Sequence, residues 1–72
     1  MQVLWRLIAV SSGQVNECQL FDHSPASAEL RIVGVTEGDT VASGWFTSID
    51  AAMTSAALLA AALRADGWID PA

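Results

Sequence analysis

Four side chains in the first half of the chain have the types that could do chemistry: Cys18, Asp22, His23 and Glu29. A thiolate beside an imidazole can act as a nucleophile, and a carboxylate can orient the imidazole. Five residues separate Cys18 from His23, which is roughly 16 Å along an extended strand, so a bend would be needed to join them. The sequence offers no recognisable glycine turn for an oxyanion. We therefore predict no catalytic residue, and we expect Cys18 to be a small buried apolar side chain.

The same region is a weak candidate for a ligand site. Asp22 and His23 stand just before Pro25, where an aspartate side chain often bonds the backbone of a turn, and this structural role is our preferred interpretation. A divalent-cation site at Asp22, His23 and Glu29 is the alternative. However, a single histidine with scattered acids lacks a recognisable ligand spacing. We expect no metal and no cofactor.

The elements that must position these residues are predicted to be strands. β-branched and aromatic residues, partly in alternation, indicate strands at residues 2–10, 14–22, 28–35 and 41–46. The segments between them are rich in turn formers and include a loop at residues 23–27 around Pro25. Short turns of this kind favour an antiparallel meander.

A long alanine-rich segment, residues 47–67, is the only helix signal. Thr47 is expected to cap a helix that begins at Ser48, and Gly67 is expected to end it in the left-handed conformation. At about 100° per residue, one face is assigned to the core; its members are Ile49, Ala52, Met53, Ala56, Leu59, Ala60 and Leu63. The predicted fold class is α+β. One domain, residues 1–72, has a four-stranded antiparallel β-meander with one C-terminal α-helix packed on one face (ββββα).

Two surfaces of this fold have no predicted cover. The outer side of the helix carries Ala51, Leu58 and Ala62, and no charged residue occurs from position 51 to position 63. Alanine tolerated on a surface explains this, and so does a second helix packed closely against small side chains. The uncovered face of the sheet is expected to hold Trp5 and Trp45. These tryptophans suit burial across an interface, or stacking on a ligand ring.

Composition narrows the classes of function. A chain of 72 residues buries only about 60% of its unfolded surface, and oligomerisation is a common remedy. Eight acids against three arginines give a net charge of −5, which repels phosphate backbones and argues against nucleic-acid binding. A single cysteine allows no internal disulfide, so a cytoplasmic location is expected. Arg6 within the apolar start indicates a strand there, not a signal peptide, and the helix is too short to span a membrane.

Three short motifs carry a family resemblance. The segment Glu17-Cys18-Gln19-Leu20-Phe21-Asp22-His23, then Ala28-Glu29-Leu30-Arg31, then Trp45-Phe46-Thr47 before a helix ending in Gly67-Trp68 resembles a group of very small bacterial single-domain proteins. They have an E-C-x-L-x-D-H strand and a C-terminal helix ending in G-W. The resemblance covers about two-thirds of the chain, and it implies a β-meander with a helix and no particular activity. This chain departs from them in the helix, where alanine and serine replace charged residues, so a shared partner is in doubt and self-association is favoured.

The sequence therefore predicts a non-enzymatic protein-interaction module. It would form a homodimer, or bind one protein partner, through apolar surface on the helix or the sheet. The alternative is a small-molecule binding domain, with the ligand against Trp5 and Trp45 and with Asp22 or His23 as polar contacts.

Overall fold

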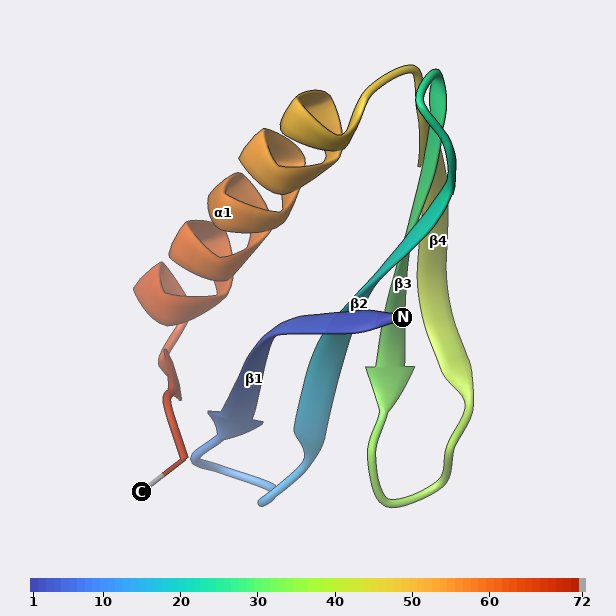
Figure 1. The fold of residues 1–72 in the computed structure, drawn as a ribbon. Coiled ribbons are helices and arrows are strands. Elements are labelled where there is room, and N and C mark those ends of the chain that lie inside the picture. The colour runs from blue at the N-terminus through green and yellow to red at the C-terminus, as the bar shows by residue number, and fades with distance from the viewer. Residues whose placement is uncertain (72) are drawn as a thin grey trace.

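A computed structural model describes residues 1–71. This part of the chain forms one antiparallel sheet and one helix (Figure 1). The strands are β1 (Gln2–Ala9), β2 (Val15–Ser24), β3 (Ser27–Gly34), β4 (Thr40–Phe46) and the short β5 (Trp68–Ile69), and the helix is α1 (Ile49–Ala65). Their order across the sheet is β4-β3-β2-β1-β5. The predicted α+β fold, with four main strands and a C-terminal helix on one face, is confirmed.

The ends of the elements differ slightly from the prediction. β2 and β3 continue through most of the expected loop and leave only Pro25 and Ala26 as the turn, where a proline has no ladder bond to make. The helix begins one residue later than predicted. Its cap is Ser48, with extended backbone, and the Ser48 Oγ accepts a hydrogen bond from the Ala51 N–H at 3.1 Å. Gly67 follows the helix with φ of 100°, in the left-handed region, as predicted.

The core lies between the sheet and α1. The sheet contributes the buried residues Leu7, Cys18, Leu20, Ala28, Leu30 and Ile32. The helix contributes Ala52, Ala56 and Ala60, which are spaced one turn apart and form an alanine ridge against the sheet. The larger members of the predicted core face are less covered, since Met53 is 45% exposed and Leu59 is 43% exposed. The prediction was therefore right for the ridge and only partly right for the larger side chains.

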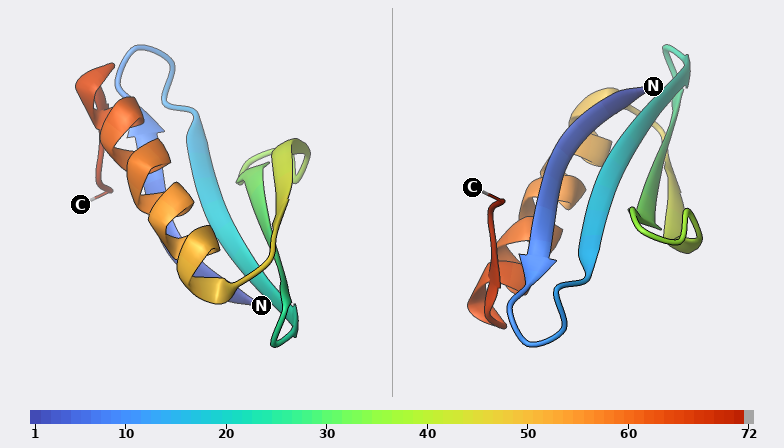
Figure 2. Two further views of the ribbon diagram at one scale, coloured as in Figure 1. Left: turned by 90° about the horizontal axis from the view of Figure 1, so that it is seen from above. Right: turned by 90° about the horizontal axis from the view of Figure 1, so that it is seen from below.

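The helix covers the sheet unevenly. Figure 2 shows α1 running alongside β1, whereas the β3–β4 hairpin diverges from the helix with distance from the connection between β4 and α1. Because the ridge consists of alanines, α1 approaches the sheet closely at one line of contact and fills little space to either side. The helix-facing side of β4 is consequently only partly covered.

Trp5 lies under the helix, so its predicted place on the open face of the sheet is wrong. A bulge between Val3 and Trp5 shifts the register of β1 against β2, and Trp5 pairs with the core residue Cys18. An extra residue in one strand turns the following side chains to the opposite face. The Trp5 indole Nε1–H donates a hydrogen bond to the Ala56 carbonyl at 2.9 Å, which joins β1 directly to the alanine ridge.

Candidate functional site

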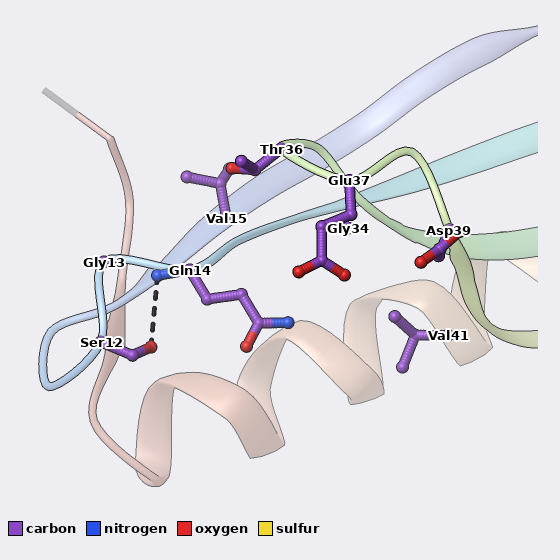
Figure 3. Close-up of a pocket in the computed structure, with 9 residues that line it drawn as sticks. All are labelled: Ser12, Gly13, Gln14, Val15, Gly34, Thr36, Glu37, Asp39 and Val41. Atoms are coloured by element: carbon purple, nitrogen blue, oxygen red, sulfur yellow. Dashed lines mark hydrogen bonds between the residues drawn. The ribbon is translucent and has the colours of Figure 1, made fainter.

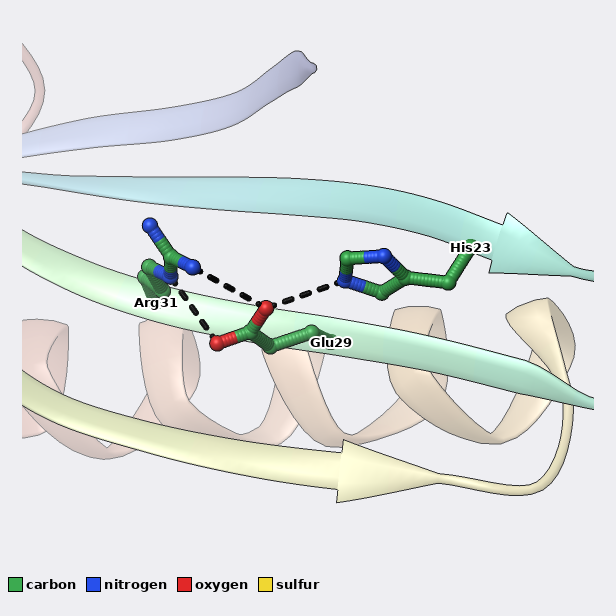
Figure 4. Close-up of polar contacts among 3 residues, drawn as sticks. All are labelled: His23, Glu29 and Arg31. Atoms are coloured by element: carbon green, nitrogen blue, oxygen red, sulfur yellow. Dashed lines mark hydrogen bonds and ion pairs between the residues drawn. The ribbon is translucent and has the colours of Figure 1, made fainter.

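A buried carboxylate lies near one end of the open face, the side of the sheet away from α1. Glu29 on β3 is only 6% exposed. Its Oε1 lies 3.0 Å from His23 Nε2, and its Oε2 accepts a hydrogen bond from Arg31 Nε at 2.9 Å (Figure 4). Arg31 Nη2 donates a second bond to Oε1 at 3.2 Å. The hydrogen bond from Arg31, followed by that from His23, holds the pKa of Glu29 below its ordinary value.

Aromatic rings lie next to this carboxylate. The Trp45 ring stacks on the His23 ring with 4.8 Å between ring centroids. The His23 ring also stacks on the Phe21 ring, with 6.3 Å between centroids. The Arg31 guanidinium carbon lies 4.4 Å from the centre of the Phe21 ring, at cation–π distance. These five residues, which we call the His23 cluster, come from β2, β3 and β4. Their outermost member is Trp45, which is 63% exposed.

A second ion pair follows on the same face. Arg6 Nε lies 2.6 Å from Glu17 Oε1, and Gln19 Nε2 donates to Glu17 Oε2 at 2.6 Å. The hydrogen bond from Gln19, then that from Arg6, lowers the pKa of Glu17. Each buried carboxylate on the open face thus has its own arginine. The two carboxylates on this face are therefore hydrogen-bonded, and Trp45 is its main exposed aromatic side chain.

The structure brings two of the three weak ligand candidates together. His23 and Glu29 are in contact, but Asp22 pairs with the core residue Ala28 and is itself exposed, on the opposite face. Within residues 1–71, no group of three or more His, Cys, Asp or Glu side chains is placed to hold a metal ion. Cys18 is fully buried on the helix side, and this burial raises its pKa to about 11, so the thiol is protonated at neutral pH.

Sequence reasoning did not assign Phe21 and Arg31 to the candidate site. The alternation of side chains could have indicated them, because it places Phe21 on the same face of its strand as His23, and Arg31 on the same face of its strand as Glu29. What alternation could not supply was the register between strands. In the structure Glu29 is opposite Phe21 on β2 and opposite Trp45 on β4.

An apolar groove separates α1 from β4 on the helix side of the sheet. The groove is lined by side chains from β3, β4 and α1, including Leu30, Ile32, Ala42, Gly44, Phe46, Ser55 and Leu59. It follows from the alanine ridge, which leaves space between the helix and the diverging hairpin. No charged residue contributes to it. Beyond the groove, the outer side of α1 exposes the predicted interface residues Ala51, Leu58 and Ala62, with Leu58 at 67%.

A further hollow lies between the β1–β2 turn and the β3–β4 turn. Figure 3 shows Gln14 and Glu37 pointing into it, and Val41 of β4 forms one border. Ser12 Oγ accepts a hydrogen bond from the Gln14 backbone N–H at 3.2 Å, an ordinary turn contact. The polar side chains that line this hollow are exposed to solvent, so none of them is held in place to bind a ligand.

Comparison of the chain with family models, with curated proteins and with solved structures gives no match. Within residues 1–71, α1 lacks the length and apolar character that a helix needs to cross a membrane. The function is therefore inferred from the geometry.

The lowered pKa values of the two buried carboxylates lead to a prediction of how the free energy of unfolding depends on pH. Folding lowers the pKa of Glu17 and of Glu29 from the ordinary value of 4.5, so each stabilises the fold fully above that value. This contribution is lost as pH falls from about 4.5 through the lowered pKa of the folded state. We expect the free energy of unfolding, measured by urea denaturation at a series of pH values, to decline below this point. Glu29→Gln should flatten the decline, and an unchanged slope in this variant would contradict the role given to Glu29.

Proposed function

We propose that the protein is a non-enzymatic interaction module that forms a homodimer through the β4 side of the molecule. The β4 surface, as we define it, consists of exposed or groove-lining residues of β4 and α1: Val41, Ala42, Ser43, Gly44, Trp45, Phe46, Ser55 and Leu59. The observation that carries the proposal is that this surface is uncharged and largely apolar on an otherwise acidic chain. Apolar surface of this kind usually marks an interaction site.

The β4 side of the molecule is less tightly packed than the rest of the fold. A radius of gyration of 12.2 Å exceeds the ~11 Å typical of a chain of this length. The excess fits the divergence of the hairpin from α1, which leaves the groove open. Because small domains bury too little surface to be strongly stable, a partner against β4 would add apolar burial on the side where the fold is least covered.

The charge distribution favours a second copy as the partner. None of the eight acids falls within β4 or within residues 51–63 of the helix. A basic partner would find no complementary charge there, whereas a second copy offers an equally uncharged surface. Acids elsewhere on the two copies are screened over about 8 Å at physiological salt. We place the dimer in the cytoplasm because its one cysteine is a buried thiol without a disulfide partner.

Sedimentation velocity over a wide concentration range tests this proposal. We expect a dimer that dissociates on dilution, and we expect Val41→Lys to raise its dissociation constant about tenfold or more, since a buried lysine would lose solvation. Val41 is 59% exposed in the single chain, so the variant should fold normally.

Leu58→Glu is the matched control on the competing surface, the outer side of α1. If Leu58→Glu dissociates the dimer and Val41→Lys does not, the interface lies on the helix and the β4 surface is the wrong assignment. A native chain that stays monomeric at every concentration would overturn self-association altogether.

A second candidate function is small-molecule binding at the His23 cluster. The exposed outer face of Trp45 could extend the stacked row by one planar ring. Trp5 cannot take part, because it is under the helix. Quenching of tryptophan fluorescence by a planar aromatic compound, lost in Trp45→Leu, would support this function. The dimer remains the preferred proposal because Glu29 already accepts bonds at both oxygens and leaves the cluster without an uncommitted carboxylate oxygen.

A further inference from the structure

Within the described residues, β4 pairs with β3 along one side only and forms an edge of the sheet (Figure 1). An unpaired edge presents backbone N–H and C=O groups that can bind another strand. Natural sheets usually block such edges with lysine, proline, inward-pointing charges or a covering segment. At the other edge, β5 covers the end of β1 at Ile8 and Ala9. β4 has no charged residue and no proline in its seven residues, Thr40–Phe46.

One blocking device is present, and it is confined to the start of the strand. A register shift opposite Ile32 and Val33 places a bulge near Val41. From Ala42 to Phe46 the pairing with β3 is regular, so the free edge of this segment keeps the geometry that a further strand requires.

We propose that β4 pairs antiparallel with β4 of a second copy, across a two-fold axis at Ser43. This inference rests on the proposed homodimer and specifies its geometry. Ser43 is the middle residue of β4, so an axis there pairs Ala42 of each copy with Gly44 of the other and places the bulge at Val41 opposite Trp45. The result is one continuous sheet that runs through both copies.

The middle of β4 has small side chains at the axis, at Ala42, Ser43 and Gly44. Val41 and Trp45 each lie two residues from Ser43, and they are 59% and 63% exposed. The bulge interrupts the alternation of side chains at Val41, which borders the hollow between the two turns. Trp45 of each copy therefore lies beside the bulge of the other. On the helix side, Ala42 faces Gly44, so no bulky side chain obstructs the seam.

The same symmetry joins the two grooves. A two-fold axis perpendicular to the sheet places both helices on the same side, with one groove on each side of the seam. Together the grooves form a trough lined by Ala42, Gly44, Phe46 and Leu59 of both copies. Because a single pair of strands buries less than the ~1,000 Å² typical of stable interfaces, the dimer should be weak and concentration-dependent.

Cysteine cross-linking tests the register. Residues opposite each other in an antiparallel pair have Cα atoms about 4.5–5.5 Å apart, which is within the range a disulfide spans. Ser43→Cys should therefore form a covalent dimer under mild oxidation. The buried Cys18 should not react, and the native chain is the control for it. Thr54→Cys, at an exposed position on the outer side of α1, is the matched control and should remain monomeric.

A charge exchange provides the second test. Ser43→Lys and Ser43→Glu should each be monomeric by sedimentation, since like charges would face each other at the axis. An equimolar mixture should recover a dimer, because lysine then faces glutamate. Ser43 is exposed in the single chain, so both variants should fold, as circular dichroism would verify.

The outcomes separate the two proposals. If the native chain dimerises but Ser43→Cys forms no more covalent dimer than Thr54→Cys, the β4 pairing is wrong and the homodimer stands. The pairing is also wrong if Ser43→Lys and Ser43→Glu dimerise as the native chain does. If the native chain never dimerises, both proposals fail.

Discussion

Replacement of Trp5 by alanine is expected to lower the free energy of unfolding by about 3 kcal/mol, the low end of the range for large core aromatic side chains, because Trp5 is partly buried. Trp5 packs against the core cluster and donates its indole hydrogen bond to the Ala56 carbonyl. The variant loses both the apolar contact and the bond. Small domains have total stabilities near the low end of about 5–15 kcal/mol, so the Trp5→Ala chain should lose a large part of its stability and unfold at a much lower urea concentration.

Two control variants separate the contributions. Trp5→Phe keeps most of the apolar contact and loses the hydrogen bond, so its cost should be nearer 1 kcal/mol. Trp45→Ala removes an exposed ring of the same type and should cost less than about 1 kcal/mol. All three are measured by urea denaturation at low protein concentration, followed by far-UV circular dichroism. Equal effects of Trp5→Ala and Trp45→Ala would contradict the placement of Trp5 under the helix.

The second large effect is expected on the alanine ridge. Ala56→Glu places a carboxylate at a position that is 2% exposed and faces the sheet. Arg6 and Arg31 cannot neutralise this carboxylate, because both are paired with glutamates on the opposite face of the sheet. An unpaired buried charge costs several kcal/mol, so α1 should detach from the sheet or the chain should unfold.

Ala57→Glu is the matched control, since Ala57 is the next residue and is exposed. Its stability should differ from that of the native chain by no more than about 0.5 kcal/mol. Urea denaturation of both variants makes the comparison. Similar stabilities for the two variants would show that the ridge does not pack on the sheet as described.

The strands and the helix could be predicted because each is encoded by a short stretch of neighbouring residues. Turn formers and alternation located the four main strands, and the alanine-rich segment located the helix. The start of the helix was displaced by one residue because Thr47 and Ser48 are both good caps, and only the backbone geometry chooses between them. β5 is two residues long and exists because β1 offers it an edge, which is a tertiary effect that no local pattern predicts.

The candidate site was harder to predict because it depends on contacts between strands. His23 and Glu29 were identified as weak candidates, but their contact with Trp45 depends on the register of three strands. Trp5 was misplaced because residues 2–10 are apolar on both sides of the strand, so alternation grouped Trp5 with Leu7 and did not say which side the helix covers. The exposure of Met53 and Leu59 depends on how α1 lies across the sheet, which helical periodicity does not specify.

The hydrogen bond from Trp5 to Ala56 also orders events in folding, because it joins residues 51 positions apart in sequence. The β2–β3 hairpin closes through a two-residue turn and can form early, since short loops close fastest. Docking of α1 is complete only when β1 has joined the hairpin and its indole bonds Ala56. The amide hydrogens of α1 should then exchange with solvent through undocking of the helix, while those of β2 and β3 wait for global unfolding. Exchange of the Trp5 indole proton should therefore report the opening of α1 from β1.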